Sequence, residues 1–147
     1  MSAGLEAFKR KLRTHAAAAI AAAQAQARKE ADIIVGFAKA AAPEEEGALI
    51  RSIRVEEADT LTTKSGAEIG FVGVNVVAGD ETTIITNKRG QKFQKAKLFE
   101  GGFLHEKKGG GTMVVQRPFL NFAKRARLKA ARANIIRAAN KAWRNGG

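Results

Sequence analysis

The sequence predicts an α+β fold with a long N-terminal helix, a small and mostly antiparallel sheet, and a C-terminal helix packed on that sheet. Three patterns lead to this prediction. Apolar and alanine positions recur at helical spacing through residues 1–42, residues 48–116 alternate as strands do, and a proline opens a second helical pattern over 118–144. A chain of 147 residues suits a single domain with a modest core.

The first helical pattern carries small or apolar side chains every three or four positions, among them Leu5, Phe8, Leu12, Ile34 and Phe37. This spacing keeps one narrow face together. One unbroken helix would be roughly 55 Å long at about 1.5 Å per residue, more than a small domain needs to cover its own sheet. We therefore expect part of it to pack on another subunit. The alternative is an ordinary amphipathic helix that bends back on its own domain.

The sheet region follows a helix stop. Pro43 ends the first helix because the residue before a proline avoids the helical region, and Gly47 supplies a turn. Alternation of Ile53 and Val55 with polar residues predicts a strand over 49–57. Further strands are expected over 66–77, 82–86 and 112–116.

The closing helix is expected to begin at Pro118 and to run to about Trp143. Its apolar residues fall on two faces of a helical wheel. One face comprises Leu120, Leu128, Ala131, Ile135, Ala138 and Ala142, and the other comprises Phe119, Phe122, Ala126, Ala133, Ile136 and Trp143. Two apolar faces predict a helix that lies between its own sheet and another partner.

The charge balance favours a polyanionic partner. The chain has 26 basic and 14 acidic residues, a net charge of +12, and no acid after Glu106. Nucleic acid is the usual partner for such an excess. Loops rich in lysine and glycine can extend into a channel and touch phosphates without reading the base sequence. The candidate contacts lie in two Gly-containing loops, 87–95 and 105–111, and are Lys88, Arg89, Lys92, Lys95, Lys107 and Lys108. The alternatives are solvated hairpin tips or a basic surface that meets an acidic protein.

Catalysis has little support in the sequence. The chain has no cysteine and two histidines, which excludes disulfides, thiol chemistry and an imidazole metal cluster. The acids Glu44, Glu45 and Glu46 have no accompanying histidine or phosphate-binding loop, so helix capping or ion pairing is their expected role. We therefore expect no enzyme, no metal, no cofactor and no membrane partner.

Three short segments carry a family resemblance. They are AKAAAPEEEGALIRSI at 38–53, AKLFEGG at 96–102 and QRPFLNFAKRA at 116–126. Together they resemble the head-tail joining, or tail-completion, proteins in the neck of long-tailed bacteriophages and related gene transfer agents. The matching positions are Pro43, Gly47, Leu49, Ser52, Ile53, Glu100, Gly101, Arg117, Pro118, Phe119 and Leu120. The chain departs from the family pattern at Glu44 to Glu46, at Phe103, and at Asn121 and Phe122.

The resemblance implies a structural virion protein that forms a ring, commonly six-fold, through which double-stranded DNA passes. Its neighbours would be the head connector or closure protein and the tail terminator or tail tube protein. It would be found in the virion neck or tail after assembly in the host cytoplasm.

Three other functions remain open. One is a neighbouring neck component, either a tail terminator or a head-closure protein. The second is a basic DNA-binding protein without sequence specificity. The weakest is a metal-dependent nuclease that uses Glu45 and Glu46.

Overall fold

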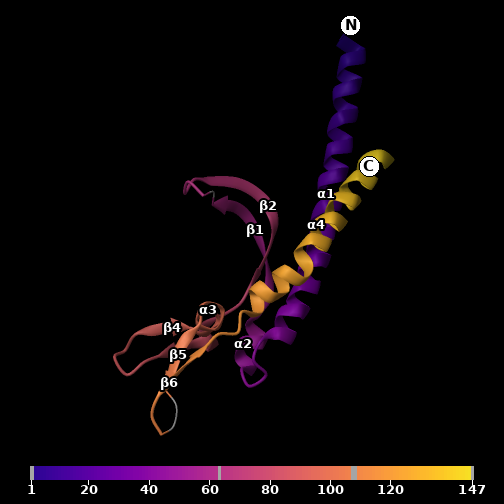
Figure 1. Cartoon of the computed structure of the whole chain (residues 1–147). Coiled ribbons are helices and arrows are strands. Elements are labelled where there is room, and N and C mark those ends of the chain that lie inside the picture. The colour runs from indigo at the N-terminus through magenta and orange to yellow at the C-terminus, as the bar shows by residue number, and fades with distance from the viewer. Residues whose placement is uncertain (1, 63, 107–108, 147) are drawn as a thin grey trace. The chain divides into compact units, whose positions relative to one another are not determined.

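The computed structural model describes residues 2–62, 64–106 and 109–146 and confirms the α+β class (Figure 1). The helices are α1 (Ser2–Ala41), α2 (Gly47–Ser52), α3 (Lys95–Gly101) and α4 (Phe119–Asn145), with a 3-10 turn η1 (Glu81–Thr83). The strands are β1 (Arg54–Thr62), β2 (Glu68–Val77), β3 (Ile84–Thr86), β4 (Lys92–Gln94), β5 (Phe103–Glu106) and β6 (Thr112–Val115).

The strands form three separate two-stranded ladders in the described part of the chain: β1 with β2, β3 with β4, and β5 with β6. The last two are antiparallel, with Ile85 opposite Phe93 and Phe103 opposite Val115. Helix α3 occupies residues 95–101, between the second ladder and the third. The small sheet expected from the alternation is therefore divided into hairpin-like ladders, and α3 was not predicted.

The strand predicted over 49–57 is wrong in its first half, because residues 47–52 form helix α2 and β1 begins only at Arg54. Ile50 N donates to the Glu46 carbonyl oxygen at 3.0 Å, which closes a helical turn. Leu49 and Ile53 are four residues apart, so one helical turn brings both to the same side. They are 0% and 2% exposed, and this shared burial favours the helix over a strand.

The two long helices pack against each other, so α4 lies on α1 where we had expected it to lie on the sheet. Phe119 and Ala123 of α4 are buried together with Ala38 and Ala42 of α1. The helix starts one residue later than predicted. Pro118 is the residue before it, and the Pro118 carbonyl accepts the first helical hydrogen bond, from Phe122 N at 2.9 Å.

The chain divides into two compact units. Unit 1 contains Met1–Glu30, Glu57–Val74 and Lys129–Gly147, and unit 2 contains Ala31–Glu56 and Asn75–Leu128. Both long helices and the β1–β2 ladder contribute residues to each unit, and the single domain remains a prediction.

Polar contacts join the two helical segments of unit 1. The buried Glu30 carboxylate accepts hydrogen bonds from the amides of Gln26 and Asn134, at 3.0 and 2.8 Å. His15 Nδ1 donates to the Trp143 carbonyl oxygen at 2.6 Å, and the two rings meet edge to face at 5.6 Å. Within the described part of the chain, the cluster of buried apolar residues lies in unit 2 and is small, because alanines supply much of it.

Candidate functional site

The three segments that carry the resemblance meet in unit 2. Leu49 and Ile53 from the first segment and Phe119 from the third are among the largest fully buried side chains, and all three belong to one cluster. The second segment forms α3, which contributes Ala96 to the same cluster and packs Phe99 against it. Residues from three distant parts of the sequence thus build one buried cluster.

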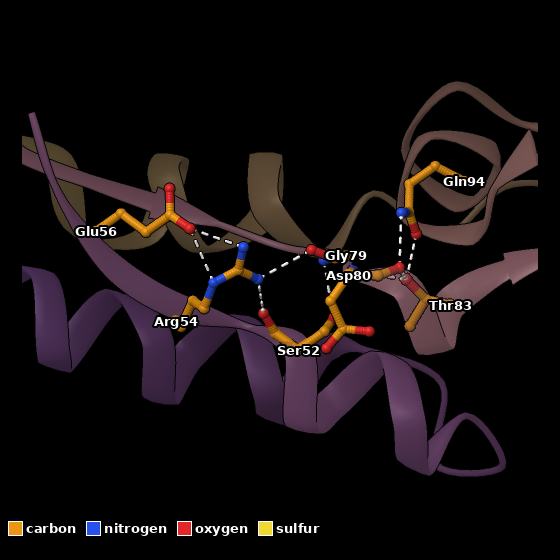
Figure 2. Close-up of polar contacts among 7 residues, drawn as sticks. All are labelled: Ser52, Arg54, Glu56, Gly79, Asp80, Thr83 and Gln94. Atoms are coloured by element: carbon orange, nitrogen blue, oxygen red, sulfur yellow. Dashed lines mark hydrogen bonds and ion pairs between the residues drawn. The ribbon is translucent and has the colours of Figure 1, made fainter.

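Ser52 joins the first segment to the end of β2. Its buried hydroxyl donates to the Leu49 carbonyl oxygen at 2.6 Å. The same hydroxyl accepts from Gly79 N at 2.8 Å (Figure 2). Gly79 has φ +100°, and a Cβ there would lie 2.6 Å from Cδ of Gln94. Ser52 therefore supplies the acceptor for Gly79 N, and the positive φ at position 79 independently favours glycine.

Arg54 reinforces the same junction, and the sequence patterns did not single it out. Its Nη1 donates to the carbonyl oxygens of Ser52 and Gly79, each at 2.9 Å. Its Nε and Nη2 face Glu56 Oε1 at 3.0 and 2.7 Å (Figure 2). This fork geometry suits an arginine and not a lysine, which has a single ammonium.

The turn after Gly79 is closed by side chains. The Asp80 carboxylate accepts from Thr82 N at 2.8 Å and from the Thr82 hydroxyl, and these two bonds lower the pKa of Asp80 below its ordinary value of 3.8. Thr83 is fully buried, and its hydroxyl bonds to the Gln94 side chain, while Gln94 Nε2 donates to the Asp80 carbonyl oxygen at 3.1 Å. The start of β3 and the end of β4 are therefore tied to one turn.

Glu100, a residue of the second segment, binds the start of the closing helix. Its carboxylate accepts from the backbone N–H of Leu120 and, at 3.4 Å, from that of Asn121. Backbone N–H groups at a helix N-terminus lack helical partners, and a carboxylate there is also favoured by the helix dipole. In the third segment, Arg117 N donates to the Phe99 carbonyl oxygen at 2.9 Å. The second and third segments are thus locked together.

The two adjacent glycines of the second segment, Gly101 and Gly102, differ in their backbone requirements, and only Gly101 is a matching position. A Cβ at Gly101 would meet nothing within 4 Å, whereas Gly102 has φ +83° and ends α3 by donating its N–H to the Leu98 carbonyl oxygen at 2.7 Å. The second glycine is therefore the one that the turn requires. At Gly47, a Cβ would lie 3.1 Å from the Arg51 guanidinium, which is the flexible end of a long side chain.

The predicted DNA-contacting cations do not form one group. Lys88, Arg89 and Lys92 are exposed in the β3–β4 hairpin, whose turn is held by Asn87 Oδ1 accepting from the N–H groups of Arg89 and Gln91, each at 2.9 Å. Lys95 is instead half-buried and ion-paired with Glu46 at 2.7 Å. Lys107 and Lys108 lie outside the described residues.

The acidic segment after α1 is used in ion pairs. Glu46 binds Lys95, and Glu45 lies 3.5 Å from Arg117. Among the residues described, no group of three or more His, Cys, Asp or Glu side chains could hold a metal ion. No helix in the described ranges is long and apolar enough to cross a membrane.

The two apolar faces predicted for α4 have different environments. The residues of the face with Leu128 and Ala131 are buried or half-buried. On the other face Phe119 is buried, but Phe122, Ile136 and Trp143 are 53%, 60% and 42% exposed. Their separations of 14 and 7 residues align these three side chains along the helix. Single exposed apolar residues are ordinary, but an aligned row is typical of a surface that contacts another protein.

An open apolar pocket of about 620 Å³ lies beside this row in unit 2. It is lined by Phe37, Ala40, Ala41, Arg117, Pro118, Phe119 and Phe122. The pocket combines the last turns of α1 with the first turn of α4, and neither helix alone indicated it.

Comparison with protein-family models, with curated proteins and with solved structures finds no match to this chain.

Proposed function

We propose that this chain is a structural virion protein of the head–tail interface, a tail-completion or head-tail joining protein that forms a ring around passing DNA. The observation that carries the proposal is the meeting of the three motif segments. Leu49, Ile53 and Phe119 share one buried cluster, and Glu100 binds the start of α4. The three segments therefore belong to one folded unit, as the resemblance implies for them, and this convergence is what supports the proposal.

Exposed apolar surface supports an assembled state. Leu5, Phe8 and Leu12 on α1 are 48%, 58% and 42% exposed, as is the row on α4 that begins at Phe122. Among the residues whose burial is described, the cluster contains few large side chains, so it contributes limited stability to a protomer. Contacts between copies would bury the remaining apolar area.

Charge supports the passage of DNA through the ring. The net charge is +12, and the β3–β4 hairpin exposes Lys88, Arg89 and Lys92 around a turn. Lysine and arginine contacts to phosphates require no base sequence, as is needed for DNA that only moves through a lumen. The same charge favours the second candidate, a basic DNA-binding protein without sequence specificity. A neighbouring neck role, tail terminator or head-closure protein, would also suit the motifs.

Electron microscopy of particles from cells that carry or lack the gene tests the proposal. We expect DNA-filled heads beside unattached tails in the deletion, and tailed particles after complementation with the intact gene. Intact tailed particles in the deletion would refute a role at the head–tail joint. The basic charge would then become the leading feature, and binding of the purified protein to DNA would test the second candidate.

A further inference from the structure

The two helical segments of unit 1 carry exposed charges of one sign. Residues 7–29 of α1 and the whole of α4 contain no acid. Within unit 1, six lysines and arginines lie in residues 9–29 and five in residues 129–144, and all eleven are exposed. Lys9 pairs with Glu6 and Arg28 with Glu57, and the other nine form no ion pair among the described residues.

The acids of unit 1 do not balance this charge. The unit has twelve basic and five acidic residues, a net charge of +7. Glu6 and Glu57 are used in the two ion pairs, and Glu30 is buried. The other two acids, Asp59 and Glu68, belong to the strands β1 and β2. The helical segments therefore form the cationic surface of this unit.

Contacts between the two segments bring their cations close together. Asn134 Nδ2 donates to Glu30 at 2.8 Å, and His15 Nδ1 donates to the Trp143 carbonyl oxygen at 2.6 Å. Cations lie within two residues of these contacts on both helices: Arg13, Lys29, Arg132, Lys141 and Arg144. Residues 15 and 30 are roughly 22 Å apart along α1 at about 1.5 Å per residue. The surface is thus elongated, which suits a long polyanion better than a single anionic group.

We propose that the paired helical segments of unit 1 bind the phosphate backbone of duplex DNA without reading its base sequence. A duplex presents about one charge per 1.7 Å of its axis, and each neutralised phosphate releases counterions. An acidic protein would match cations at one defined patch, whereas these cations follow both helices along their length. The inference deepens the proposed function and rests on it for the choice of duplex DNA among polyanions. It adds a surface in unit 1 to the three exposed cations of the β3–β4 hairpin.

Two full-length variants with equal loss of charge test this surface. The helix-pair variant neutralises four exposed cations of unit 1: Arg13→Gln, Lys29→Gln, Arg132→Gln and Lys141→Gln. The unit 2 variant is the matched control and neutralises four exposed helical cations of the other unit: Lys39→Gln, Arg51→Gln, Lys97→Gln and Lys124→Gln. Both lose four positive charges, so a difference between them cannot come from net charge. Circular dichroism checks the fold of each.

Fluorescence anisotropy of labelled DNA duplexes, titrated at several salt concentrations, measures the dependence of affinity on salt. Each lost phosphate contact lowers the log–log slope by about 0.9, so the helix-pair variant should lose at least about 2 and at most about 3.6. The unit 2 variant should lose less than about 1. Two duplexes of unrelated sequence should give the same slopes. If the fourfold variant does not fold, Lys29→Gln and Lys141→Gln are measured singly, each with an expected loss of about 0.9.

Four results would overturn the inference. They are a wild type that does not bind either duplex, equal losses in the two variants, a loss confined to the unit 2 variant, and a strong preference for one duplex sequence. Vesicles of phosphatidylserine and phosphatidylcholine test the other polyanionic surface. If the helix-pair variant loses binding to vesicles but retains the wild-type slope on DNA, the surface binds lipid and the inference is wrong.

These measurements use purified protein and do not depend on particle morphology. The deletion phenotype reports on the head–tail joint alone. A protein that joins heads to tails but does not bind DNA through unit 1 would overturn this inference and leave the proposed function intact. A protein that binds DNA through unit 1, with intact tailed particles in the deletion, would do the reverse.

Discussion

Replacing Phe119 by alanine tests whether the buried cluster of unit 2 holds the protein together. The ring is 1% exposed and lies with Ala38, Ala42 and Ala123, whereas Phe122, one turn later on the same helix, is 53% exposed. The pair provides a matched comparison, because Phe122→Ala removes the same atoms from the surface of the same helix.

The expected loss in the free energy of unfolding is about 3–5 kcal/mol for Phe119→Ala. Full burial of a phenylalanine side chain contributes about 1.5–3 kcal/mol, and the space left behind adds to the loss. Phe122→Ala should change the free energy of unfolding by less than about 1 kcal/mol.

Urea denaturation at low protein concentration, followed by circular dichroism, measures both changes, since dilution limits any contribution from assembly. The midpoint should fall for Phe119→Ala with an unchanged dependence on urea concentration. A loss below about 1 kcal/mol, or equal losses for the two variants, would refute the assignment of Phe119 to the core.

Three other changes test the polar contacts and the hairpin. Ser52→Ala should lower the free energy of unfolding by about 1–3 kcal/mol, because Gly79 N loses its acceptor; a neutral result in urea denaturation would contradict this. The lowered pKa of Asp80 stabilises the fold above pH 3.8, and this contribution disappears as pH falls through the folded-state pKa. Below about pH 4 the melting temperature of the wild type should therefore fall more steeply than that of Asp80→Asn, and parallel curves would show that Asp80 is not involved. Replacing Lys88 by alanine should reduce the salt dependence of DNA binding by about 0.9 in the log–log slope if the side chain contacts a phosphate, whereas Lys95→Ala should not, because Lys95 pairs with Glu46.

The long elements could be predicted from the sequence because their signals are local and repeated. Helix α1 ends close to Pro43 and α4 starts close to Pro118, since a proline restricts its neighbours wherever it lies. Residues 47–52 could not be assigned in this way. Apolar residues at 49, 50 and 53 suit a helical turn as well as a short strand, and only burial of Leu49 with Ile53 decides between them.

The polar contacts of Arg54 and Lys95 in unit 2 could not be predicted from the sequence, for a different reason. Arg54 and Gly79 are 25 residues apart, and their contact depends on how β1 and the end of β2 meet. Lys95 shows the same limit: within the sequence it belongs to a run of basic residues, but α3 brings it to Glu46. Charge patterns identify which residues are basic, and only tertiary contacts determine which of them are neutralised.

Several of the residues that carry the resemblance are buried in unit 2. Leu49, Ser52, Ile53 and Phe119 are buried, and Glu100 binds a helix terminus, so these residues build and hold the fold of unit 2. Residues that decide a role within a neck would have to meet partners at the surface. The exposed candidates are Leu5, Phe8 and Leu12 on α1, the row on α4 and the basic hairpin, and no motif residue lies in any of them. Variants at these exposed positions, which leave the buried centre intact, therefore separate function from folding.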